Sequence, residues 1–208
     1  MNTREEILAR LRASRDPSAS LPDLRPPAAV PGDPIALFVE RATAVGIQVM
    51  KDTAHTWVAS AVSELRKRSI RAAALWDDPL LSPLAAALES SGIEVISSAR
   101  HTTDRLAEVA AGITTADAAI ALTGTLLLPC DARRPRTTSL LPPLHMVVLP
   151  ARHIVPTLGH LFERVNGPLP SALTFITGPS RTADIELTPV KGAHGPTEVI
   201  AYLIMEER

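Results

Sequence analysis

Strand-like and helix-like segments alternate along most of this chain, and this alternation restricts the fold more than any other feature. Short apolar runs rich in β-forming residues occupy residues 47–50, 72–76, 93–96, 118–122, 126–128, 145–149, 173–176 and 199–204. Apolar residues at helical spacing occur at 35–45, 53–67, 82–90, 101–111 and 155–165. Strands separated by helices are typical of βαβ units, which build parallel sheets. We therefore predict an α/β domain with a mostly parallel sheet.

Residues 1–33 differ in composition from the rest of the chain. Thr3, followed three residues later by Glu6, forms a capping-box pattern that predicts a short helix ending near Ser14. Repeated prolines between residues 17 and 34 then interrupt any regular element and predict an extended arm. We divide the chain into this helix and proline-rich arm, residues 1–33, and one α/β domain, residues 34–208. The arm is compatible with docking on a neighbouring subunit, for example in a homo-oligomer, whereas fraying in solvent is the expected outcome for a lone monomer.

Charge, hydropathy and cysteine content exclude several classes of partner and cofactor. A formal net charge of −1 gives no electrostatic support for binding nucleic acid or an anionic membrane. No apolar run approaches the roughly 20 residues that span a bilayer, and the charged N-terminus lacks the apolar core of a signal peptide. Cys130 is the single cysteine, which excludes an internal disulfide and a cysteine cluster for zinc or iron–sulfur. We expect a cytoplasmic protein without a cofactor of its own.

The most concentrated group of reactive side chains follows the strand-like run 173–176, which we expect to be buried. Gly178 allows the backbone to pass close to a ligand, and Pro179 suits a tight turn or the first turn of a helix. Ser180 and Arg181 add a hydroxyl and a guanidinium, which together predict a site for a carboxylate or phosphate at a helix N-terminus. The alternative is that Ser180 only caps that helix.

Acidic residues and a histidine follow this turn. Asp184 or Glu186 is a candidate base or nucleophile, although either could simply pair with Arg181. His194 lies between glycines and is a candidate general acid or base, or a side chain that fixes its own loop. His194, His145 and Asp184 are suitable metal ligands in type, but no ligand spacing supports a metal site. We predict no metal.

A second turn, Thr123-Gly124-Thr125, lies between two apolar runs. It either presents backbone N–H groups to an anion or forms a simple bulge. Because this turn and the segment 178–181 both follow strands, we expect both at the carboxyl edge of the sheet, where ligands bind in such folds. The predicted ligand-binding residues are Thr123, Gly124, Thr125, Gly178, Ser180 and Arg181. The arginines at 133, 134 and 136 are most simply a solvated charge run.

Three segments resemble the lactate-utilisation protein C family, the small LUD-domain proteins. They are ADAAIALTGTLLL at 116–128, SLLPPLHMVVLP at 139–150, and TGPSRTADIE at 177–186 followed by KGAHGP at 191–196. The resemblance extends from about residue 34 to the end of the chain. One position departs from it, because Leu122 stands where members of the family commonly carry an acidic residue.

The resemblance implies a three-layer α/β fold similar to the sugar-phosphate isomerase and CoA-transferase-like folds. It also implies a role in the oxidation of L-lactate to pyruvate, beside partner subunits that carry iron–sulfur clusters. The single cysteine agrees with a cluster-free component that binds a small anionic ligand. Two alternatives remain open: a stand-alone isomerase or acyl-CoA-transferase-like enzyme, and a non-catalytic assembly or ligand-sensing protein.

Overall fold

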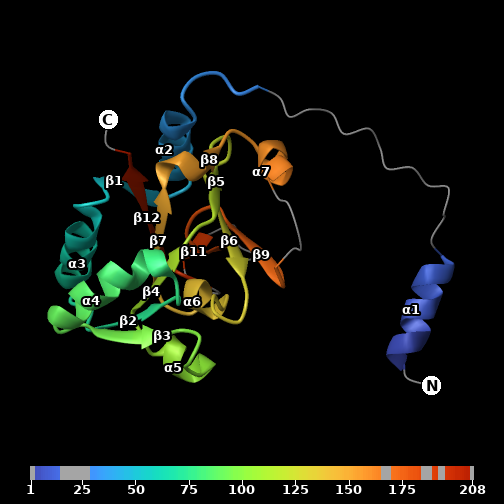
Figure 1. The fold of residues 1–208 in the computed structure, drawn as a ribbon, viewed down its shortest axis with the longest axis horizontal. Coiled ribbons are helices and arrows are strands. Elements are labelled where there is room, and N and C mark those ends of the chain that lie inside the picture. The colour runs from blue at the N-terminus through green and yellow to red at the C-terminus, as the bar shows by residue number, and fades with distance from the viewer. Residues whose placement is uncertain (1–2, 15–28, 165–169, 184–188, 192–194, 207–208) are drawn as a thin grey trace.

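A parallel six-stranded sheet forms the centre of the computed structural model (Figure 1). The structure describes residues 3–14, 29–164, 170–183, 189–191 and 195–206. The strands are β1 (Ile47–Thr53), β2 (Ala72–Leu75), β3 (Glu94–Ser97), β4 (Ala111–Thr115), β7 (Leu144–Pro150) and β12 (Glu198–Met205), in the order β1-β12-β7-β4-β2-β3. Every neighbouring pair is parallel. The predicted α/β class with a mostly parallel sheet is confirmed.

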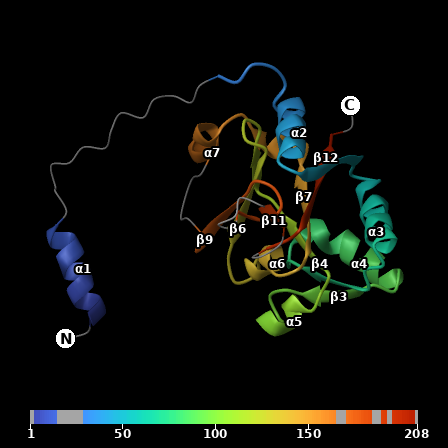
Figure 2. The ribbon, with the colours of Figure 1, turned by 180° about the vertical axis from the view of Figure 1, so that it is seen from behind.

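Helices and a second sheet cover the two faces of the parallel sheet, which gives three layers. The helices α3 (Trp57–Lys67) and α4 (Ser82–Ser90) lie on one side, and a four-stranded sheet lies on the other (Figures 1 and 2). The second sheet has the order β8-β5-β6-β9, from β5 (Ala118–Ile120), β6 (Thr125–Cys130), β8 (Ile154–Val155) and β9 (Ala172–Ile176). Further helices are α1 (Thr3–Ala13), α2 (Pro34–Ala44), α5 (Thr103–Ala107), α6 (Thr137–Leu140) and α7 (Leu158–Arg164).

Side chains alternate along the hairpin β5–β6, so its two faces pack into two different hydrophobic clusters. Ala119, Leu126 and Leu128 point toward the parallel sheet and join the main core. Ile120 and Leu127 point the other way and pack with α7 in a smaller cluster. The central strands β4 and β7 are buried on both faces, as parallel strands between covering layers are expected to be.

Several local expectations differ from the structure. The predicted helix 101–111 is only the short α5, because Ala111 begins the buried central strand β4. Gly112 fits this strand because a Cβ there would lie 1.9 Å from the carbonyl oxygen of Thr138 in α6. The helix expected from residue 53 begins instead at Trp57, since β1 continues to Thr53. Tertiary packing overrides helix periodicity at both places.

The strand 173–176 is present but is not buried as predicted. It is the edge strand β9 of the second sheet, and the Phe175 side chain is 43% exposed. Within the described part of the chain, no helix is both long and apolar enough to cross a membrane.

Candidate functional site

The turn that carries Arg181 lies at the amino edge of the parallel sheet, not at the carboxyl edge that its position after a strand predicts. A cleft of about 210 Å³ there is lined by Gly46, Gln48, Pro179, Arg181 and the segment 197–200. Gln48 and residues 198–200 belong to the first residues of β1 and β12, which run parallel. The expectation is wrong because β9, the strand before this turn, belongs to the second sheet and not to the parallel one.

No helix begins at this turn, so the predicted helix N-terminal anion site is wrong in its local structure. Arg181–Ala183 form the strand β10, which pairs with β11 (Pro189–Lys191) as an antiparallel hairpin. The N–H of Ser180 donates to the carbonyl of Pro196 at 2.8 Å. The backbone N–H of Ser180 is therefore used to fix the turn.

Close packing against the loop between α2 and β1 positions the Arg181 side chain. Gly178 has φ +104°, and a Cβ there would lie 2.5 Å from the carbonyl oxygen of Val45. One guanidinium nitrogen of Arg181 donates to the same carbonyl at 3.5 Å, over Gly46. Among the described residues, no carboxylate forms an ion pair with Arg181. The exposed guanidinium is therefore held at a cleft with donor capacity remaining.

A chain of hydroxyl groups joins the two predicted turns. The Thr123 and Thr125 hydroxyls are 2.7 Å apart, and the Thr125 and Thr177 hydroxyls are 2.8 Å apart. Gly124, with φ +66°, makes its close approach to helix α2, because a Cβ there would lie 2.4 Å from the Ala42 nitrogen. The structure thus links Thr123 and Thr125 by hydrogen bonds to Thr177, the residue just before Gly178. The predicted candidates Asp184, Glu186 and His194 lie outside the described residues.

His145 is a structural residue inside the parallel sheet. Its side chain is fully buried in β7, and its Nε2 lies 2.9 Å from the Thr114 hydroxyl. Burial lowers the pKa of His145 to about 3, so the ring is neutral at physiological pH. In the part of the chain that the structure describes, no group of His, Cys, Asp or Glu side chains is arranged to hold a metal ion.

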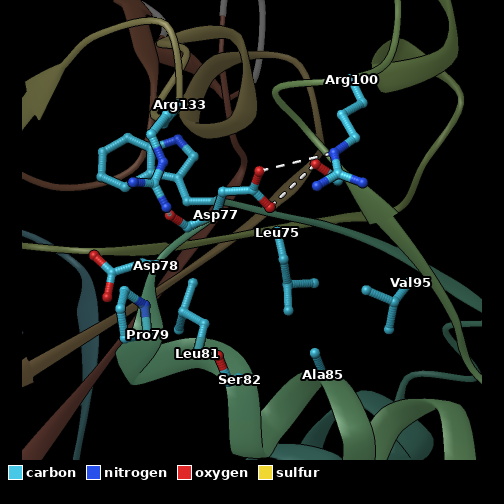
Figure 3. Close-up of a pocket in the computed structure, with 12 residues that line it drawn as sticks. Leu75, Asp77, Asp78, Pro79, Leu81, Ser82, Ala85, Val95, Arg100 and Arg133 are labelled. Carbon is cyan, nitrogen blue, oxygen red and sulfur yellow. Dashed lines mark hydrogen bonds and ion pairs between the residues drawn. The ribbon is translucent and has the colours of Figure 1, made fainter.

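The carboxyl edge of the parallel sheet carries a larger pocket, and the sequence patterns did not assign any of its residues to a ligand site. It has a volume of about 370 Å³ (Figure 3). Its charged members are Asp77, Asp78, Arg100 and Arg133. The sequence signal was the Asp-Asp-Pro segment directly after the apolar run 72–76, which places two carboxylates at a strand end. Arg133 belongs to the basic run whose pattern indicates a solvated surface.

A neighbouring cavity of about 430 Å³ shares Asp78 with this pocket and contains two titratable groups with shifted pKa values. Burial raises the pKa of Asp117 despite an ion pair with Arg134 at 3.1 Å. Burial also lowers the pKa of His153, and the charge of Arg152 lowers it further. Partial desolvation of such groups is common where ligands bind, although it also occurs in structural ion pairs.

Comparisons with known proteins agree on one family. The family model for the LUD domain matches residues 35–204. "Lactate utilization protein C" of Halalkalibacterium halodurans is 35% identical over 157 residues, which are 69% of this chain and 66% of the relative. The protein of the same name from Macrococcus caseolyticus is 34% identical over 103 residues, which are 47% of this chain and 44% of the relative. The chain therefore matches about half to two thirds of the length of these relatives.

A solved structure is similar in fold. The crystal structure of a DUF162 family protein from Deinococcus radiodurans superimposes with a TM-score of 0.60 at 19% identity. The alignment covers 82% of this chain and 96% of that chain. At this identity the likeness concerns the fold alone.

Proposed function

The chain belongs to the LUD domain family, and we propose that it acts in lactate utilisation as a component that binds a small anion. The name carried by the curated relatives supports the pathway. The observation that supports anion binding is the exposed Arg181 guanidinium, which sits at the 210 Å³ cleft without an ion-pair partner among the described residues. A planar guanidinium suits a carboxylate such as that of lactate or pyruvate because it can donate two parallel hydrogen bonds.

In this proposal the ligand lies between the Arg181 turn and the amino ends of β1 and β12. Thr197 and Gln48 supply neutral polar groups around it, and Gly178 lets the turn approach the body closely. The acidic residue of the lining, Glu198, is paired with Arg68 at 3.0 Å. The candidate acids Asp184 and Glu186 and the candidate acid–base His194 follow in the same segment of the sequence. The threonine hydroxyls at 123 and 125 would support the turn through Thr177 rather than contact the anion.

We further propose that the electrons of lactate oxidation pass through partner proteins with iron–sulfur clusters. Cys130 is the one cysteine of the chain, and it is buried in β6. Residues 1–33, with the helix α1, would contribute to contacts with those partners in the cytoplasm. Mixing the purified chain with the cysteine-bearing partners should give a complex by size-exclusion chromatography, whereas the chain alone should not oxidise lactate.

Thermal unfolding with L-lactate, pyruvate and inorganic phosphate tests the anion site directly. A ligand at about 100 times its dissociation constant adds roughly 2.7 kcal/mol to the free energy of unfolding. We expect a carboxylate to raise the melting temperature of the wild type and to have no effect on Arg181→Ala. Arg41→Ala is the matched control, because Arg41 is an exposed arginine on α2 that pairs with Glu40 at the surface. An equal ligand shift in Arg181→Ala and wild type would contradict the proposed site.

A further inference from the structure

The pocket at the carboxyl edge lies above the ends of β2 and β3, beside the point where the connections of the parallel sheet diverge. In the order β1-β12-β7-β4-β2-β3, the chain leaves β2 for β3 on one side and leaves β4 for strands on the other. The loops after β2 and β4 therefore separate above the strand ends, which is where ligands bind in open α/β sheets. The residues after β4 line the neighbouring cavity of about 430 Å³, and the pocket adjoins that cavity at Asp78, which lines both. Residues Trp76, Asp77 and Asp78 follow β2 and line the pocket.

The pocket has an apolar floor and a charged rim. Leu75, Leu81, Ala85 and Val95 form the floor between α4 and the strands β2 and β3 (Figure 3). Asp77 lies across the pocket from this floor, between Arg133 and Arg100 (Figure 3). A volume of about 370 Å³ is enough for a small organic molecule.

The two arginines of the rim retain most of their donor capacity. Arg100 is 78% exposed and reaches Asp77 only at 4.0 Å. Arg133 donates to the backbone carbonyl of Asp77 at 3.4 Å and forms no ion pair with a carboxylate of the described residues. The Asp77 carboxylate also accepts a hydrogen bond from the Ser97 hydroxyl at 3.3 Å. Arg100 therefore approaches the carboxylate of Asp77, and Arg133 its backbone carbonyl, at the mouth of an apolar cavity.

Neighbouring charged groups are already committed to the fold. Asp78 accepts hydrogen bonds from the Leu80 N–H and the Thr115 hydroxyl, each at 2.9 Å. Arg134 pairs with Asp117 and Asp131 and lies over the Trp76 ring, 5.9 Å from its centroid. These groups build the wall, and the rim itself carries two guanidinium groups, Arg100 and Arg133, and one carboxylate, Asp77.

We propose that this pocket is a second ligand site, distinct from the Arg181 cleft, for a small anion that carries a short apolar chain. Its carboxylate or phosphate lies between Arg100 and Arg133, and its chain lies on the floor formed by Leu75, Ala85 and Val95. This site would take a different ligand from the proposed lactate site, because lactate has no apolar chain that could cover the floor.

Trp76 provides a local probe of binding, because it lines the pocket and the chain has only one other tryptophan, Trp57 in α3. In a Trp57→Phe background, titration with hexanoate and with hexyl phosphate should change the Trp76 fluorescence to saturation. Inorganic phosphate should bind much more weakly, since it leaves the floor uncovered. A preference for one of the two alkyl anions identifies the headgroup.

Variants test the two halves of the pocket separately. Arg133→Gln and Arg100→Gln should each weaken binding of the alkyl anions roughly tenfold, as the loss of a charged hydrogen bond predicts. Ala85→Leu fills the space above the floor, so it should weaken the binding of hexanoate while the charges of the rim stay unchanged. Arg181→Ala should leave the Trp76 signal unchanged, which separates this site from the proposed lactate site. Absence of a saturable signal, or binding that is insensitive to both rim variants, would overturn the proposal.

Discussion

Two groups of charged side chains, one at each edge of the parallel sheet, are satisfied to very different degrees. At the amino edge, Glu64 is 8% exposed and forms a close ion pair with Arg68. Arg68 also pairs with Glu198 at the start of β12 at 3.0 Å, and Lys67 lies 3.4 Å from Glu64. The hydrogen bond from Arg68 lowers the pKa of Glu64 in spite of its burial.

At the carboxyl edge, the charges on the rim of the 370 Å³ pocket are open to solvent. Asp77 faces two arginines, but its ion pair with Arg100 is as long as 4.0 Å and that arginine is 78% exposed. In a closed network such as that of Glu64, removing one partner destabilises the fold, because a buried charge is left without its counter-ion. An open arrangement contributes little to folding and keeps its donors for a ligand. The contrast therefore separates charges that hold the sheet from charges that are available for binding.

The largest expected effect is on the closed network. Arg68→Ala should lower the free energy of unfolding by about 3 kcal/mol at neutral pH, because Glu64 is left buried without its main partner. Urea denaturation measures this loss. Because the pKa of Glu64 is lowered in the folded state, this stabilisation is present above its ordinary value of 4.5 and is lost as pH falls through the lower folded value. Arg105→Ala breaks a surface pair with Glu94 and should have a clearly smaller effect.

The next effect concerns the backbone contacts that hold the second sheet near the amino edge. Gly124→Ala should cost about 2 kcal/mol, because the new Cβ meets the backbone of Ala42 and the residue keeps a positive φ. Gly92→Ala is a matched control, since Gly92 has φ +77° and a methyl group added there would meet no other atom within 4 Å. Equal losses in thermal or urea unfolding would show that conformational strain alone, and not the close contact, matters at Gly124.

A smaller effect follows from the buried histidine near the amino edge. The folded-state pKa of His145 is about 3 against 6.5 when exposed, so its protonation favours the unfolded chain. Its contribution to stability is complete above the unfolded value and is lost as pH falls from there toward the folded value. Between about pH 7 and about pH 5.5 this should lower the free energy of unfolding by about 1 kcal/mol. His145→Gln should remove that pH dependence, and an unchanged slope would assign it to other groups.

The smallest effect is expected at the open rim. Arg100→Gln and Arg133→Gln should each change the free energy of unfolding by less than about 0.5 kcal/mol, as is typical of exposed charges. Urea denaturation of these two variants and of Arg68→Ala under the same conditions compares the three losses directly. A loss at the rim as large as that of Arg68→Ala would mean that these arginines are structural, and the contrast between the edges would disappear.

Local patterns predict the elements well where one strand or helix can be recognised by its own residues. The last strand, expected at 199–204, is observed at Glu198–Met205, and the helix expected to end near Lys67 ends there. The pattern is misleading at 101–111, where apolar spacing suits a helix but the buried position of Ala111 and Gly112 requires a strand. Burial on both faces is a property of the neighbours and is not visible in the segment itself.

The position of the candidate sites depends on pairing that spans the whole chain. Gly178 and Arg181 are recognisable by their residue types, but their place at the amino edge follows from β9 pairing with β6 and not with the parallel sheet. Asp77 and Arg133 are 56 residues apart and meet only because the loop after β6 folds over the end of β2.

The sequence by itself determined the α/β class, the turns rich in glycine and hydroxyl groups, and the absence of cysteine pairs, because these depend on local periodicity and residue chemistry. Only the tertiary structure decided which strands pair, which edge each turn occupies and which charges are paired. Strand order and ion pairing arise from contacts between distant segments, and the same local pattern is compatible with several such arrangements.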